Sequence, residues 1–170
     1  QTCALPIFAA VAGISPEEAQ GFAAAQGIPV AAPNYKAILA DPEIDGVHVC
    51  TPNATHAPIA IEALKAGKHV LCEKPLAMSA AEAQQMVELA AKAKLCNATN
   101  HNLRYYPAVQ HIRRMIEAGE LGEILTVQGT YSQDWLLYDT DFNWRIQKKA
   151  NGPLRVMGDI GSHWMDLVTF

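Results

Sequence analysis

The chain has 170 residues, 50% of them hydrophobic, which is typical of one globular domain or slightly more. Its 13 lysines and arginines against 17 acidic residues give a formal net charge of −4. Because no basic surplus exists to displace counterions from a phosphate backbone, we predict no nucleic-acid partner. No uncharged apolar run approaches the roughly 20 residues that cross a bilayer, so we predict no membrane partner.

Four cysteines, Cys3, Cys50, Cys72 and Cys96, are widely spaced along the chain. Cys50 and Cys72 fall inside apolar runs typical of strands, where a thiol packs as a small hydrophobic group. Buried, unpaired thiols are typical of a reducing compartment, so we predict a cytoplasmic protein.

The chain ends suggest a fragment of a longer protein. Residues 1–8 form a leader without methionine that resembles the in-frame translation of a sequencing-library adapter, and we expect this leader to be non-native. The alternative is an ordinary terminus. Phe170 stands inside an amphipathic pattern that has no cap or stop signal after it.

Residues 9–102 alternate short apolar runs with helical periodicity, as in a parallel sheet with crossover helices. Ser15 with Glu18 and Ser79 with Glu82 have capping-box spacing, which predicts helix starts. The expected strands are 9–13, 47–50, 69–72 and 95–99, and the other expected helices are 34–40 and 56–66. The pattern therefore predicts an α/β fold.

From residue 103 the pattern changes, and we place a domain boundary between 102 and 103. Pro107 starts an expected helix with Val109, Ile112 and Ile116 on its buried face. Residues 124–131 are expected to form a longer strand, and residues 132–158 show no clear period.

Two polar clusters follow neighbouring strands of the predicted sheet. They are Thr51-Pro52-Asn53 with His56, and Glu73-Lys74-Pro75. Ligands of an open parallel sheet lie beyond the carboxyl ends of its strands, so we expect both clusters at one crevice. Pro75 restricts Lys74 to an extended backbone, which predicts that the amine projects from a strand end. The alternative is a lysine that is only solvated.

A third cluster lies near the end of the chain, in a segment expected to be helical. Asp159, His163 and Asp166 stand at spacings of 0, 4 and 7 and so share one helix face. An imidazole oriented by a carboxylate one turn away is suited to acid/base chemistry. The alternative is a capping aspartate followed by a partly buried histidine on an amphipathic helix.

Other chemistry finds less support. His48 with Cys50 and His69 with Cys72 make a zinc site conceivable, but their spacing matches no established ligand pattern, so we predict core packing and no metal. The motifs of a hydrolase nucleophile elbow and of a nucleotide phosphate loop are absent. G-x-G-x-x-G is also absent, but it belongs to the first strand–helix unit, and residues 9–13 are expected to be a second strand.

Taken in order, these motifs resemble the Gfo/Idh/MocA family of NAD(P)-dependent oxidoreductases over about residues 9–170. The markers are Val11-Ala12-Gly13, Ser15-Pro16-Glu17-Glu18, Cys50-Thr51-Pro52-Asn53 with His56, Glu73-Lys74-Pro75, Asn102 and Arg104 with Pro107, Trp144-Arg145, and Gly158-Asp159-Ile160-Gly161-Ser162-His163 with Asp166.

The resemblance implies a Rossmann domain at 9–102 that lacks its first strand–helix unit. It also implies that 103–170 begin an α/β domain with a mostly antiparallel sheet. Family members oxidise or reduce a carbon of a sugar, inositol or related polyol, and the full-length protein is expected to be a homo-oligomer. The Lys-Pro peptide of the family's E-K-P motif is often cis.

The same resemblance assigns roles to residues. Lys74, Asp159 and His163 are implied as catalytic, with Lys74 on the reacting hydroxyl, His163 as acid/base and Asp159 as substrate ligand or orienter. The implied cofactor-binding residues are Ser15, Thr51, Pro52, Asn53, His56, Glu73, Lys74, Asn102, Trp144 and Arg145. No acidic residue follows the strand at 9–13 to bind a ribose hydroxyl, and Ser15 is free to bind a phosphate, which favours NADP over NAD.

Two other functions remain open from sequence alone. One is a ligand-sensing protein of the same fold that binds a dinucleotide without chemistry, although a sensor has no need of Lys74, Asp159 and His163 together. The other is a stand-alone binding module. Against it, we expect the fragment expressed alone to be inactive, to expose apolar faces and to aggregate or bind dinucleotide poorly.

Overall fold

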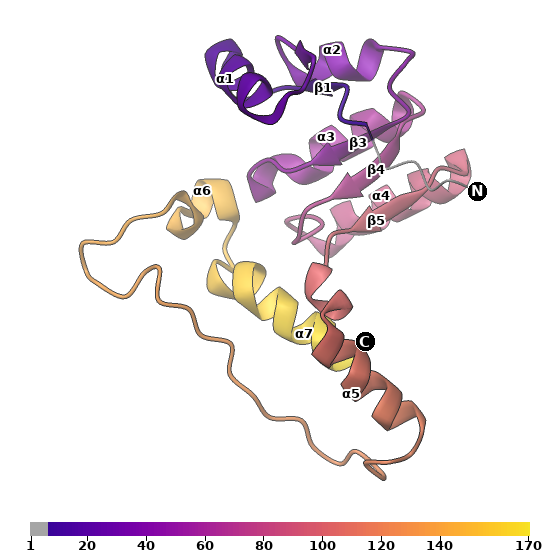
Figure 1. Cartoon of the computed structure of the whole chain (residues 1–170), viewed down its shortest axis with the longest axis vertical. Coiled ribbons are helices and arrows are strands. Elements are labelled where there is room, and N and C mark those ends of the chain that lie inside the picture. Colours follow the sequence, from indigo (N-terminus) through magenta and orange to yellow (C-terminus); the bar gives the residue numbers. More distant parts are fainter. Residues whose placement is uncertain (1–6) are drawn as a thin grey trace.

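The computed structural model describes residues 7–170, so the first six residues of the predicted leader lie outside the described part (Figure 1). Its strands are β1 (Ala10–Val11), β2 (Val30–Ala31), β3 (Gly46–Val49), β4 (His69–Cys72) and β5 (Asn97–Thr99). Its longer helices are α1 (Pro16–Gln26), α2 (Tyr35–Ala40), α3 (His56–Lys65), α4 (Ala80–Ala93), α5 (Pro107–Glu117) and α7 (Ser162–Thr169). The shorter ones are η1 (Asn53–Thr55), η2 (Asn102–Tyr105), η3 (Trp144–Ile146), α6 (Lys148–Asn151) and the π-helical turn η4 (Met157–Gly161).

The strands are all parallel, as predicted, but they form two sheets instead of one. β1 pairs with β2, and β3, β4 and β5 pair in sequence order. Among the described residues no strand pairing joins β1 to β3. The α/β fold class is therefore confirmed for the first part of the chain.

The helix starts follow the predicted caps. Ser15 accepts the amide of Glu18, and Ser79 accepts the amide of Glu82. In both helices the glutamate reaches one residue further back than a capping box requires, to the amides of Ile14 and Met78. Each helix start is thus fixed by residues within five positions, which is why the sequence predicts it.

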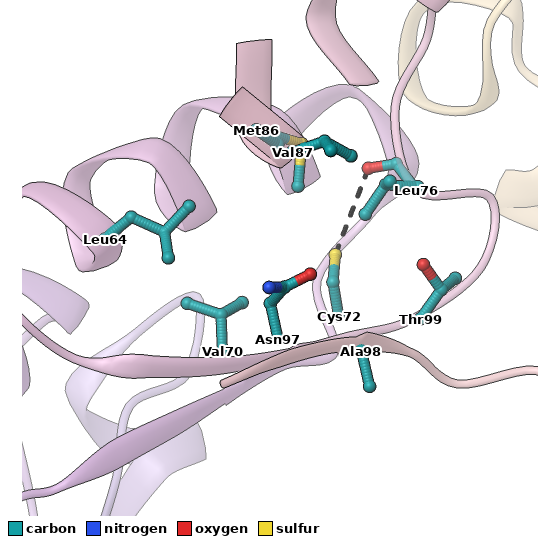
Figure 2. A pocket seen from close by; sticks show the side chains of 9 residues that line it. All are labelled: Leu64, Val70, Cys72, Leu76, Met86, Val87, Asn97, Ala98 and Thr99. Atoms are coloured by element: carbon teal, nitrogen blue, oxygen red, sulfur yellow. Dashed lines mark hydrogen bonds between the residues drawn. The ribbon is translucent and has the colours of Figure 1, made fainter. Parts of the chain in front are cut away.

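The core lies between the β3–β4–β5 sheet and the helices α3 and α4 (Figure 1). Val49, Val70 and Cys72 meet the small side chains of α3, among which Ala60 is fully buried. A cavity of about 30 Å³ lies between Val70, Cys72 and α4, with room for one water molecule and not for a cofactor. Figure 2 shows the side chains that line it.

The cysteines follow the prediction only in part. Cys72 is fully buried, and burial raises its pKa to about 12. Cys50 is exposed, so the prediction that it is buried is wrong. It follows β3 on the same side as His48, and that side faces away from α3, which packs on Val49. Cys50, Cys72 and Cys96 are free thiols.

A buried lysine holds the connection between α2 and β3. Lys68 is 7% exposed, and its Nζ donates to the main-chain oxygens of Asp41 and Ile44 at 2.6 and 2.7 Å. Two carbonyl dipoles thereby compensate the charge that burial removes from water.

The second part of the chain is mostly helical, and the predicted antiparallel sheet is not seen. Residues 124–131 form no strand, contrary to expectation. A strand requires a hydrogen-bonded neighbour, and no described segment beyond β5 supplies one. The apolar face of α5 stays open for the same lack of a partner, with Ile112 and Ile116 exposed. None of the described helices is long and apolar enough to cross a membrane.

Candidate active site

Lys74 and Asp159 meet between the two parts of the chain. Lys74 follows β4 and precedes Pro75, and the peptide bond between them is cis, as the resemblance implies. Its Nζ donates to Asp159 Oδ1 at 2.7 Å and to the main-chain oxygen of Asp159 at 2.8 Å. Both side chains are largely buried, so little water reaches this ion pair.

Asp159 lies between two cations. Its Oδ2, the oxygen not bound by Lys74, stands 3.9 Å from Arg145 Nε. The Arg145 guanidinium stacks over the Trp144 ring at 4.6 Å from the centroid, which fixes its direction. Asp159 belongs to the π-helical turn η4, a type of local widening that occurs often at functional sites.

His163 stands one turn beyond Asp159, at the start of α7, and lies between two rings. The His101 ring meets it edge-on with centroids 6.1 Å apart, and the Tyr131 ring does so at 6.0 Å. Its Nδ1 is buried without a hydrogen-bond partner. Burial, followed by the charges of Lys74 and His101, lowers the pKa of His163 from its ordinary value of 6.5, against the opposite pull of Asp159 and Asp166.

Asp166 does not orient His163, although the helical spacing predicts that it could. It accepts two hydrogen bonds from Arg104, through Nε and Nη2, and its Oδ1 lies 3.9 Å from His101 Nδ1. The two carboxylates on this helix face are therefore occupied by Arg104 and Lys74. Neither forms a hydrogen bond with the imidazole of His163.

Two buried side chains, His56 and Asn53, hold the Thr51-Pro52-Asn53 turn in place. His56 is 1% exposed, and its ring nitrogens lie 2.7 Å from the main-chain oxygens of Pro75 and Thr51. His56 therefore ties this turn to the loop that carries Lys74. Asn53 is also buried, and its Nδ2 donates to Asn151 Oδ1 in α6.

Glu73 lies beside the same crevice. Its Oε1 accepts from Asn100 Nδ2 at 2.5 Å and stands 3.6 Å from His48 Nε2. His48, Cys50 and Glu73 have potential ligand atoms within 4.8 Å of one another, the only such group of three within residues 7–170. The carboxylate is already engaged by Asn100, and the absence of a metal stays a prediction.

Two predicted cofactor-binding residues lie apart from this group. Ser15 Oγ accepts the amide of Glu18 as a helix cap beyond β1. Asn102 is exposed at the start of η2. Neither forms a hydrogen bond with Lys74, Asp159 or His163 in the part of the chain that the structure describes.

Sequence analysis missed two residues of the site. His101 follows β5, so the rule that places ligand residues after strand ends would have included it with Thr51 and Lys74. Asn151 lies in an aperiodic region, and nothing in the sequence pairs it with Asn53. Its Nδ2 also donates to the main-chain oxygen of Arg145 at 2.7 Å, which links Asn53 to the segment that faces Asp159.

The chain is similar to known oxidoreductases along most of its length. Residues 5–101 match the model of the oxidoreductase family with an NAD-binding Rossmann fold, and residues 109–170 match the GFO/IDH/MocA C-terminal domain. Levoglucosan dehydrogenase of Pseudarthrobacter phenanthrenivorans is 37% identical over 168 residues, which cover 98% of this chain and 43% of that protein. The 1,5-anhydro-D-fructose reductase of Ensifer adhaerens is 33% identical over 159 residues, or 92% of this chain and 46% of that protein.

Solved structures give the same result. Levoglucosan dehydrogenase in complex with NADH and levoglucosan superposes with a TM-score of 0.91 and 37% identity, over 96% of this chain and 44% of that one. An oxidoreductase domain protein from Kribbella flavida has a TM-score of 0.90 and 36% identity, over 96% and 43% of the two chains. The chain spans less than half the length of the relatives that it matches. It belongs to the Gfo/Idh/MocA family of oxidoreductases with an NAD-binding Rossmann fold.

Proposed function

We propose that the full-length protein transfers a hydride between NAD(P) and a hydroxyl-bearing or carbonyl carbon of a sugar, inositol or related polyol. The observation that carries the proposal is the contact of Lys74 with Asp159, one helical turn from His163. An amine and an imidazole in one crevice can stabilise and deprotonate the oxygen of a reacting carbon. Levoglucosan dehydrogenase and glucose-6-phosphate 3-dehydrogenase among the relatives support a sugar substrate.

Each group has a distinct role in this proposal. Lys74 donates a hydrogen bond to the reacting oxygen, and His163 takes the proton from that oxygen or returns it. Asp159 holds the amine of Lys74 in place. The low pKa of His163 keeps its ring neutral near neutral pH, which is the form that accepts a proton. The nicotinamide, when bound, supplies or accepts the hydride.

The residues present fit such a cofactor. Thr51, Glu73, Trp144 and Arg145 offer hydroxyl, carboxylate and stacking groups where parallel strands end, and this is the edge of a Rossmann sheet that binds dinucleotides. Pro52, Asn53, His56, Asn102 and the Lys74 stem complete the proposed lining. Buried Asn53 and His56 contribute by shaping the turn beneath Thr51.

For the cofactor we propose NAD(H) and give up the preference for NADP. That preference depends on the absence of an acidic residue after β1 and on Ser15, whose hydroxyl oxygen accepts the amide of Glu18 as a helix cap. The levoglucosan dehydrogenase complexes contain NADH, which favours the cofactor without a 2′-phosphate.

The proposal extends to the setting of the enzyme. We place the Rossmann domain at 9–102 and the start of the substrate domain at 103–170. The free thiols suit a reducing, cytoplasmic compartment. The open apolar face of α5 is consistent with burial by further sheet structure, through which the full-length protein would form a homo-oligomer.

The test is a turnover assay of the full-length protein with NAD⁺ and NADP⁺ against levoglucosan, glucose, inositol and other polyols. We expect reduced nicotinamide to form with a sugar or polyol, and faster with NAD⁺. Dinucleotide binding without turnover on any of these substrates would favour the ligand-sensing alternative. Failure to bind either dinucleotide would overturn the proposal and favour a stand-alone binding module.

A further inference from the structure

The candidate acid/base His163 lacks the support that such a histidine commonly has. A carboxylate usually holds one ring nitrogen and so fixes the plane of the imidazole. Here Asp159 binds Lys74, Asp166 binds Arg104, and His163 Nδ1 is buried without a partner. Something other than a hydrogen bond to Nδ1 must fix this ring.

The ring contact from His101 supplies that constraint. The two imidazoles lie nearly perpendicular, at 88°, with centroids 6.1 Å apart. Edge-to-face geometry at this separation is an attractive arrangement of aromatic rings. Tyr131 contacts His163 in similar geometry, at 79°, but its side chain is 39% exposed and comes from a segment without regular structure.

His101 lies just after β5, and its main-chain amide donates to the oxygen of Thr99 at 2.9 Å, whereas Tyr131 comes from an irregular segment. The Nδ1 of His101 is buried without a hydrogen-bond partner, and Asp166 Oδ1 lies 3.9 Å away, beyond hydrogen-bond distance. Asp166 is fixed by the two hydrogen bonds from Arg104. The Arg104 guanidinium is stacked over the ring of Phe170, 4.7 Å from its centroid. A continuous series of contacts thus runs from η2 to α7 and back to the ring of His101.

We propose that His101 is a positioning residue for the reaction: its ring fixes the plane of the His163 imidazole through the edge contact. The inference rests on the proposed role of His163 as the acid/base. His101, which follows β5, then has the orienting role that a carboxylate has in other sites. Lys74, Asp159 and Asp166 are the other charged groups that face His163, and Tyr131 is the remaining ring.

The arrangement has an electrostatic consequence. His101 and His163 each carry a pKa below 6.5, with burial as the main cause, and the charge of His101 further lowers the pKa of His163. Two neighbouring imidazoles resist being protonated together, so their titrations are coupled. Loss of the ionisable ring at 101 therefore raises the pKa of His163, so the titration of His163 reports on the contact between the two rings.

Two variants of the full-length protein separate the parts of this role. His101→Phe keeps a ring against His163 but cannot ionise, and His101→Ala removes the ring. We expect His101→Phe to keep kcat at the optimum within a few-fold while the acid limb of the kcat/KM profile moves to higher pH. We expect His101→Ala to lower kcat about 10–100-fold with little change in KM, because the imidazole plane is no longer fixed.

NMR titration of the His163 ring, with histidines labelled in nitrogen-15, gives a readout that does not require turnover. The control is His111→Ala, because His111 is exposed on α5. Unchanged kcat in a folded His101→Ala variant, or an unchanged His163 titration in His101→Phe, would overturn the inference. If the titration shifts but the wild-type protein turns over no sugar or polyol, the proposed function fails and the contact between the rings stands.

Discussion

Lys74 Nζ binds two oxygens of Asp159, the carboxylate at 2.7 Å and the main-chain carbonyl at 2.8 Å, although 85 positions separate the two residues. The contact joins the loop after β4 to the helical turn that leads into α7. Because the main-chain oxygen is one of the acceptors, Lys74 fixes the position of the turn as well as the direction of its side chain. The placement of His163 relative to Lys74 follows from this contact.

Replacing the amine tests both its chemistry and its hold on Asp159. We expect Lys74→Met in the full-length protein to lower kcat by about 10²–10⁴, the range in which acid/base assistance contributes. Asp159→Asn replaces the charged carboxylate with a neutral amide of the same shape, and we expect this variant to lower kcat as well. Steady-state kinetics with circular dichroism check the result. Turnover near the wild-type rate in folded Lys74→Met would remove Lys74 from the mechanism.

Stability is expected to depend on pH through two half-buried histidines, His101 and His163. The pKa values of His101 and His163 lie below the ordinary 6.5 in the folded state, mainly because of burial. The unfolded chain then binds more protons below about pH 6.5, so the free energy of unfolding falls as pH drops from there through the lowered folded-state values.

Urea unfolding at a series of pH values between about 8 and 5 measures this dependence. His101→Phe removes one of the two groups, and we expect a shallower loss of stability below about pH 6.5. His111→Gln replaces an exposed histidine and serves as the control. An equal slope for wild type and His101→Phe would contradict the prediction.

The buried Lys68 is expected to matter for folding and not for chemistry. Lys68→Met keeps the apolar stem but leaves the carbonyls of Asp41 and Ile44 without their donor. We expect a loss of about 1–3 kcal/mol in the free energy of unfolding, the usual cost of unpaired polar groups. Lys65→Met, at an exposed position of α3, is the matched control and should change stability by less than about 0.5 kcal/mol. Chemical denaturation of the wild type, Lys68→Met and Lys65→Met measures these free energies. Equal stability of the wild type and Lys68→Met would contradict the prediction.

The amide contact between Asn53 and Asn151 is expected to affect cofactor binding. Asn151→Ala leaves Asn53 Nδ2 buried without its partner, which loosens the turn after β3. We expect KM for the dinucleotide to rise while kcat changes less, with a stability loss of about 1–3 kcal/mol. Asn97→Ala removes an exposed amide from β5 and should leave both quantities near wild type. An unchanged dinucleotide KM in Asn151→Ala would show that the turn holds its shape without this contact.

Features that depend on nearby residues could be predicted from the sequence. Ser15 and Ser79 start helices because each cap is completed within three residues. The strands β3 and β4 follow from short apolar runs, and the crevice at their ends follows from parallel topology. The meeting of Lys74 with the Asp159 segment came from the family resemblance, because 85 positions lie between them.

Features that depend on a distant partner were predicted wrongly or missed. The helical spacing of Asp159, His163 and Asp166 is real, but Lys74 and Arg104 compete for the carboxylates, and no local pattern reveals that competition. Residues 124–131 were expected to form a strand, yet a strand forms only beside a second one. Cys50 has an apolar neighbourhood in sequence, but its exposure is decided by which face of the sheet α3 covers.

The strands form two sheets that one further strand could join. In the Rossmann order 3-2-1-4-5-6, β2 and β1 correspond to places 3 and 2, and β3, β4 and β5 to places 4, 5 and 6. A strand at place 1 would pair with β1 on one side and β3 on the other. In the proposed function, the turn that follows it would meet the dinucleotide beside Thr51, so one strand would both close the sheet and complete the proposed cofactor crevice.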